Sequence, residues 1–178
     1  MACLNSLKGV YFNMCDANLA GVKEIYLTDD LANLQVSAVT SALTVTNISG
    51  ATFYGYQIEK QQGYLTSTAN FNDNGRLLYY TNEVRIAFGK LDKDKHLEFM
   101  ALTHNPVKAL VLDNNGIWHF LSYDAYLAAN SGVAQTGQSF DDDNQYEVIL
   151  SGQSAYPSFI VDEATAKAVI EEPTNPAQ

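Results

Sequence analysis

The segment from Tyr64 to Phe88 constrains the fold more than any other part of the chain, because it reads as two strands joined by a tight turn. The turn contains Asn74-Gly75, and an Asn-Gly pair between β-forming residues is a strong hairpin signal, since glycine adopts positive φ without strain. We therefore predict strands at residues 64–71 and 77–88, joined through residues 72–75.

The first strand of this hairpin has no purely apolar face. Its two faces alternate as Tyr64, Thr66, Thr68 and Asn70 against Leu65, Ser67, Ala69 and Phe71. Burial alone does not stabilise such a ribbon, so we predict that copies of the chain cover its edges in a ring or close it into a barrel. The alternative is a solvent-exposed β-arm with no role in assembly.

One amphipathic helix follows the hairpin. Asp92 is a suitable N-cap, and Asn105-Pro106 ends the helical pattern. Apolar residues and one histidine recur at helical spacing, which predicts that a stripe packs on the sheet, consisting of Leu97, Met100, Ala101 and His104.

The rest of the chain is dominated by short strand patterns. Further strands are expected at residues 24–28, 42–48, 52–59, 107–112, 116–121, 146–152 and 158–162. In the strand at 42–48, strict alternation places Val45 and Ile48 on opposite faces. Residues 123–129 and 164–170 are expected to form short helical segments, and 131–144 a polar loop.

The length of 178 residues favours one domain. We expect an N-terminal arm or first strand at 1–28, a single β-rich domain at 29–170, and a flexible acidic, proline-containing tail at 171–178. The predicted fold class is mainly β with one flanking α-helix, a β-sandwich or barrel with a long protruding β-hairpin.

The charge distribution argues against several partners. The net charge is -10, and from Ala109 onward one lysine stands against ten acidic residues. An acidic chain without a basic stripe is a poor nucleic-acid binder, because that affinity depends on Lys and Arg at phosphates. No apolar run reaches membrane-spanning length, and no signal peptide is evident, so we expect no membrane partner and synthesis in the cytoplasm.

No constellation of residues predicts catalysis, a metal or a cofactor. Cys3 and Cys15 are too few for a disulfide framework or a zinc site. His96, His104 and His119 lack the pattern of a chelating or catalytic set, and neither a P-loop nor a nucleophile elbow occurs. The Asp141-Asp142-Asp143 run lacks the glycine and terminal glutamate of a calcium loop and is typical of a solvated loop. We expect no enzyme activity and no cofactor.

In the order of its segments and in their residue patterns, the region from Ala42 to Val161 resembles the tail-tube-type virion proteins of tailed phages, particularly those of Bacteroides-infecting and crAss-like phages. The features that carry the resemblance are the Gln57-to-Thr68 segment, the hairpin, the helix after Asp92 and the Asn114-Asn115-Gly116 turn. The resemblance implies a sandwich or barrel flanked by one helix, with subunits joined in rings, commonly hexameric, that stack into a channel for DNA ejection. Position in the tail tube or in a neck ring stays open.

This resemblance implies specific roles for the polar segments. Lumen or ring-assembly candidates are Thr66, Thr68, Asn70, Asn82 and Glu83, and inter-ring loop candidates are Asp141, Asp142 and Asp143. Six copies at -10 each would place about -60 on one ring, and an acidic wall repels passing DNA. The implied partners are further copies of the chain and other tail or neck proteins of the virion.

Two other classes of protein stay open. A capsid decoration or head-tail adaptor protein of a phage would share the acidic, β-rich profile but bind as single copies or trimers. A secreted β-sandwich adhesin or carbohydrate-binding module would need an export signal and a platform of exposed aromatic residues.

Overall fold

The computed structural model describes residues 18–58, 62–139 and 141–172. Cys3 and Cys15, most of the predicted N-terminal arm, and residues 173–178 of the predicted tail lie outside these ranges. The strands are β1 (Val22–Thr28), β2 (Gln35–Val39), β3 (Thr44–Ser49), β4 (Phe53–Tyr56), β5 (Tyr64–Phe71), β6 (Leu77–Gly89), β7 (Lys108–Asp113), β8 (Trp118–Leu121), β9 (Ala128–Gln135), β10 (Gln145–Ser154), β11 (Phe159–Val161) and β12 (Ile170–Glu171). The helices are α1 (Lys93–His104) and the short α2 (Glu163–Lys167).

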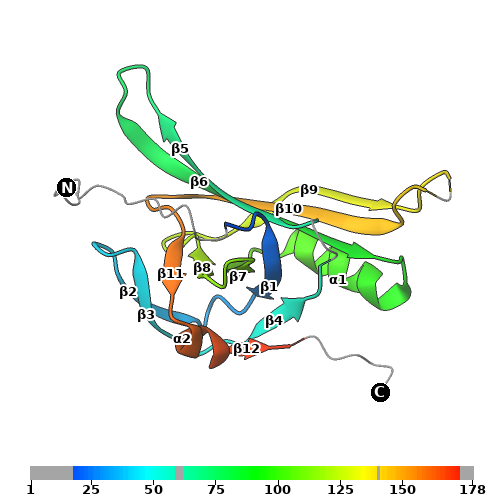
Figure 1. Ribbon diagram of the computed structural model, residues 1–178, viewed down its shortest axis with the longest axis horizontal. Helices are drawn as coiled ribbons and strands as arrows, with labels where there is room; N and C mark the ends of the chain where they lie inside the picture. Colours follow the sequence, from blue (N-terminus) through cyan, green and yellow to red (C-terminus); the bar gives the residue numbers. More distant parts are fainter. Residues whose placement is uncertain (1–17, 59–61, 140, 173–178) are drawn as a thin grey trace.

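The strands form two sheets, and the mainly β fold predicted from the sequence is confirmed. The larger sheet has eight strands in the order β12-β4-β1-β7-β8-β11-β3-β2, and the smaller has four in the order β5-β6-β10-β9. The two sheets pack as a sandwich, with α1 against the smaller sheet and the β5-β6 hairpin projecting at one end (Figure 1). The single main helix and the long hairpin are therefore both present.

The hairpin has the predicted bounds within one residue. Gly75 has a φ of +73°, which explains why the turn requires glycine at this position. Asn72 stabilises the turn, because its side-chain oxygen accepts backbone N–H groups from Asn74 and Arg76. The register runs from Tyr64 opposite Arg85 to Phe71 opposite Leu77.

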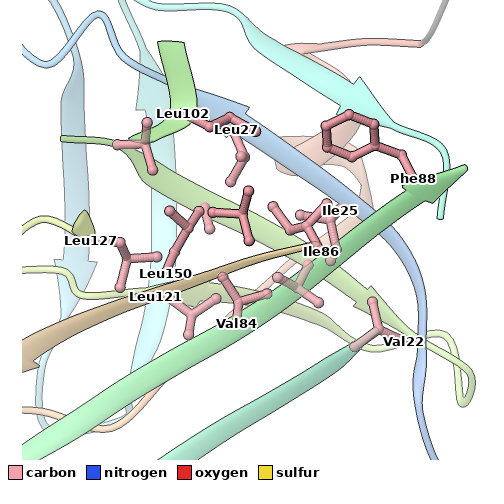
Figure 2. Packing of buried hydrophobic residues seen from close by; sticks show 14 of the residues in the cluster. Val22, Ile25, Leu27, Val84, Ile86, Phe88, Leu102, Leu121, Leu127 and Leu150 are labelled. Carbon is pink, nitrogen blue, oxygen red and sulfur yellow. The ribbon is translucent and has the colours of Figure 1, made fainter. Parts of the chain in front are cut away.

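The main core lies between the two sheets. Ile25 and Leu27 of β1 meet Val84 and Ile86 of β6, and Leu150 of β10 packs among them (Figure 2). The opposite faces of these strands have different surroundings in the two sheets. In β6 the other face is polar, so only one face of the smaller sheet is buried.

A second core lies on the other side of the larger sheet. Leu110 of β7, Phe53 of β4 and Val45 of β3 belong to this one cluster, although β4 and β3 are far apart in the strand order. The larger sheet must therefore curve so that both of its ends enclose the same core. Strands β1 and β7 are buried on both faces as a result, and Tyr26 and Ile25 belong to different cores.

The N-cap of α1 is confirmed, but the predicted packing stripe is wrong. The Asp92 side chain accepts the backbone N–H of Lys95 at 2.9 Å. Leu97 and Met100 are 54% and 52% exposed, and Ala101 and His104 are exposed as well. The packed face instead carries Phe99 and Leu102, because β9 presents Gly132 beneath α1 and lets the Phe99 ring approach closely.

Three local predictions need correction. Residues 123–129 form a turn that leads into β9 instead of a helix, and residues 131–135 belong to that strand instead of a loop. Val45 and Ile48 are buried in the same core, because a bulge at Thr46 shifts the alternation of β3 by one residue.

The ends of the described chain lie within the larger sheet. Strand β1 pairs with both β4 and β7, and β12 pairs with β4 through Ile170 and Glu171. Residues 22–28 are thus part of the body of the sandwich, and the sheet continues to Glu171, which the sequence reading placed in the tail. The predicted helical segment at 164–170 corresponds to α2 followed by β12.

Candidate assembly surface

The two edge strands of the smaller sheet are its most unusual feature. Strands β5 and β9 are each eight residues long, and within the described residues each pairs along one side only. Neither contains a charged residue or a proline, the residues that proteins commonly use to prevent pairing at an exposed edge. Among the residues that the structure describes, nothing pairs with the outer side of either edge, which leaves room for a further antiparallel strand.

The outer face of the smaller sheet is polar along β5 and the facing part of β6. Thr66 lies opposite Glu83 and Thr68 opposite Thr81, and the Asn70 amide donates to the Thr81 hydroxyl at 2.9 Å. Four of the five lumen candidates therefore share this face: Thr66, Thr68, Asn70 and Glu83. Cross-strand hydrogen bonds fix two of these side chains, Asn70 through Thr81 and Glu83 through Tyr64, and the face presents hydroxyl, amide and carboxylate groups.

Charges on this face are few and mostly paired. The Arg85 guanidinium donates to the Glu147 carboxylate at 2.6 Å, and this bond lowers the pKa of Glu147 and raises that of Arg85. The Tyr64 hydroxyl donates to Glu83 at 2.5 Å, a bond that raises the pKa of Tyr64. The face therefore presents no unpaired cation among the residues described, and most of the net charge of -10 lies elsewhere.

Asn82 does not belong to this surface, and its prediction as a lumen residue needs correction. It follows the opposite face of β6 and is 0% exposed. Its side-chain oxygen accepts the Ser67 hydroxyl at 2.7 Å, and its amide donates to the Tyr156 carbonyl at 3.2 Å. The Ser67 oxygen also accepts the Ser158 N–H, so Asn82 connects the hairpin to the segment that enters β11.

The three aspartates predicted as an inter-ring loop lie between β9 and β10 and are exposed. Asp142 has a structural task, because its carboxylate accepts the backbone N–H groups of Gln138 and Ser139, which lowers its pKa. Asp141 and Asp143 make no hydrogen bond within the described chain and are exposed to solvent. The loop therefore contributes negative charge at one end of the β9-β10 hairpin.

Asp113, His119 and Ser158 lie in a row, in the order of a catalytic triad. His119 lies between Asp113 and Ser158, at 3.4 Å and 3.5 Å respectively. Both distances exceed the hydrogen-bond reach of about 2.6–3.2 Å at which a histidine activates a serine. Asp113 also accepts two backbone N–H groups in the β7-β8 turn, so its carboxylate has a structural function.

In ranges 18–58, 62–139 and 141–172, no group of three or more His, Cys, Asp or Glu side chains has the arrangement of a metal site. Neither described helix has the length and hydropathy needed to cross a bilayer.

Sequence reasoning missed β9, which forms the second edge of the candidate assembly surface. Its residues Ala128–Gln135 have low β-propensity, and only the pairing with β10 identifies the strand. The absence of charge and proline over these eight residues was the available signal.

Comparison with protein-family models and with curated proteins gave no match.

Proposed function

We propose that this protein is a structural subunit of a phage virion that assembles through its smaller sheet into rings, and that the rings stack into a channel for DNA ejection. The observation that carries the proposal is the pair of unprotected edges, β5 and β9, on the same four-stranded sheet. The resemblance to tail-tube-type proteins supports the virion context, with location in a tail tube or neck ring.

The strand directions favour closure. The four strands β5, β6, β10 and β9 are all antiparallel to their neighbours. Because the number of strands is even, β9 of one copy meets β5 of the next in antiparallel orientation, and the alternation continues through every copy. A contact between two different edges of identical chains is heterologous, and such contacts produce a ring when the rotation closes.

The size of such a ring follows from strand geometry. For six copies, strands about 4.8 Å apart and tilted about 40° would place the backbone on a circle about 24 Å in radius. Subtracting the side chains leaves a channel wide enough for duplex DNA. The six-fold number comes from the resemblance, whereas the strand spacing is general.

The chemistry of the outer face suits a channel wall. Thr66, Thr68 and Asn70 present uncharged polar groups, and Glu147 neutralises Arg85. Affinity for DNA depends on cations that displace counterions from phosphates, so a wall without free cations binds the duplex weakly. The acidic charge on the remainder of the subunit adds repulsion. Passage without specific binding is the expected result.

The proposal is tested by blocking β5 with proline. Alternate residues of an edge strand direct their N–H groups outward, so one of the adjacent variants Thr68→Pro and Ala69→Pro removes an outward N–H and spares the bonds to β6. The wild-type chain should form rings in negative-stain images across a concentration series. The variant that removes the outward N–H should remain folded, as measured by circular dichroism, and should sediment as a monomer.

Two results would contradict the proposal. Rings that persist in both proline variants would exclude β5 as the joining edge. A wild-type chain that is monomeric at every concentration would favour a capsid decoration or adaptor protein, which binds as separate copies.

A further inference from the structure

The tip of the β5-β6 hairpin carries an exposed apolar cluster beside a cation. Phe71 and Leu78 are 61% and 56% exposed, and Leu77 lies opposite Phe71 across the strands. Arg76 occupies the turn, and among the described residues its guanidinium has no ion pair or side-chain hydrogen bond. Asp73 is the other charge in the turn. An exposed apolar cluster at the end of a protruding hairpin is typical of a contact surface.

A cleft of about 390 Å³ lies far from this tip, between β1, β4 and α1. Its acidic and aromatic residues are Asp29, Tyr54, Tyr56 and Glu98, and no lysine or arginine is among its described lining residues. The Tyr56 hydroxyl donates to Glu98, and burial together with this bond raises the pKa of Tyr56. We call this the acidic cleft.

The acidic cleft has the features that bind an arginine side chain. Two carboxylates provide acceptors for a guanidinium, and the tyrosine rings provide faces on which it stacks. Ala101 lines the cleft, and Leu97 lies one helical turn before it with its side chain exposed. Apolar surface therefore borders the acidic groups, as it borders Arg76 on the hairpin tip.

We propose that the hairpin tip of one copy docks in the acidic cleft of a second copy, with Arg76 between Asp29 and Glu98. Arg76, a cation without an ion pair among the described residues, complements a cleft that holds two carboxylates and no lysine or arginine, and this match carries the choice of occupant. Each surface adds exposed apolar residues to the contact. Truncating an arginine at the centre of an interface commonly has a large effect on binding, so Arg76 is the residue to test.

The positions of the two surfaces decide what kind of assembly results. Strand β6 has 13 residues and spans about 40 Å, with the tip at its start. Glu98 also borders a second hollow lined by Phe88 and Gly89, so the cleft lies near the end of β6. Figure 1 shows the hairpin turn and α1 at opposite ends of the molecule. Docking of tip into cleft therefore repeats along the strand direction.

The tip-to-cleft contact adds a second kind of contact to the proposed function. Its interpretation as ring stacking rests on that proposed function. Edge pairing joins copies around a ring, whereas the tip-to-cleft contact joins copies of successive rings. Each ring would make as many such contacts as it has subunits, so a weak single contact becomes a stable junction. The tip-to-cleft contact itself does not require that rings form.

Disulfide cross-linking tests the contact directly. In full-length chains with Cys3 and Cys15 replaced by serine, Asn74→Cys on one copy is mixed with Ala101→Cys on another. A cross-linked heterodimer should form under mild oxidation, at a yield at least tenfold above that of Asn74→Cys mixed with Gln138→Cys, an exposed control in the β9-β10 loop. A yield equal to the control would overturn the proposal.

Charge exchange tests the role of Arg76. Arg76→Glu should lower the Asn74→Cys to Ala101→Cys yield at least tenfold, and Asp29→Arg on the cleft-bearing copy should restore it. The matched control Asp73→Asn removes the acid of the same turn and should not lower the yield. Loss without restoration, with both variants folded by circular dichroism, would show that Asp29 does not face Arg76 and would refute this pairing.

The results separate the contact from the ring. One proline variant of β5 is expected to form no rings. If cross-linking persists in that variant, the result would support the tip-to-cleft contact and show that it does not depend on ring formation. Rings without cross-linking would retain the proposed function and refute the contact.

Discussion

Replacing Asn82 by alanine should destabilise the fold by more than any change on the outer face of the same hairpin. The substitution removes the acceptor of the Ser67 hydroxyl and the donor to the Tyr156 carbonyl, both at a site with 0% exposure. Two neutral hydrogen bonds contribute about 1 kcal/mol each, and an unpaired buried carbonyl adds about 1–2 kcal/mol. We expect a loss of about 3 kcal/mol in unfolding free energy.

The measurement is urea denaturation followed by circular dichroism, at a protein concentration where sedimentation shows a monomer. Thr66→Ala is the matched control, because Thr66 lies exposed on β5 and its side chain makes no hydrogen bond within the described chain. Its effect should stay below about 1 kcal/mol.

A double-mutant cycle with Ser67→Ala makes the prediction sharper. Because Ser67 and Asn82 share a hydrogen bond, their combined effect should fall short of the sum by about 0.5–1.5 kcal/mol. An Asn82→Ala loss below about 1 kcal/mol, or strict additivity with Ser67→Ala, would refute the assignment of Asn82 as the link between the hairpin and the segment that enters β11.

Three further predictions concern the cores and a buried lysine. Phe159→Ala, at a fully buried site, should lower the unfolding free energy by about 3–5 kcal/mol in urea titrations, whereas Ile160→Ala on the exposed side of β11 should lower it by less than about 1.5 kcal/mol. Gly152→Ala should reduce the yield of folded protein and the thermal midpoint, because its Cβ would lie 2.3 Å from the Tyr126 carbonyl oxygen; an unchanged midpoint would contradict this packing. Burial lowers the pKa of Lys108 to about 8, so the folded chain releases this proton at a lower pH than the unfolded chain does. The unfolding free energy of the wild type, measured relative to that of Lys108→Met, should therefore rise by about 1 kcal/mol from pH 8 to pH 10. A difference that stays constant over this pH range would contradict the prediction.

Local chemistry made the hairpin and the start of α1 predictable. Asn74-Gly75 requires a turn with positive φ, and Asp92 satisfies a backbone N–H that the first helical turn leaves free. Both signals act within a few residues and are present whatever surrounds them. The mainly β fold follows from the strand patterns between such signals.

The face of α1 was not predictable in the same way. Both the stripe through Leu97 and Met100 and the stripe through Phe99 and Leu102 are apolar, so spacing alone does not distinguish them. The choice depends on Gly132, a residue of β9 whose missing side chain makes room for Phe99. The exposed stripe then becomes available surface next to the acidic cleft.

The candidate assembly surface shows the same division between sequence and structure. The polar alternation of β5 by itself identified Thr66, Thr68 and Asn70 as one face, because side chains alternate strictly along a strand. Only the tertiary structure established that Asn82 is buried and that β9 is the second open edge, since both depend on pairing with residues distant in the sequence. Sequence alone thus determined the hairpin, the helix cap and the β-rich class through short-range chemistry, whereas long-range packing decided which faces and edges stay exposed.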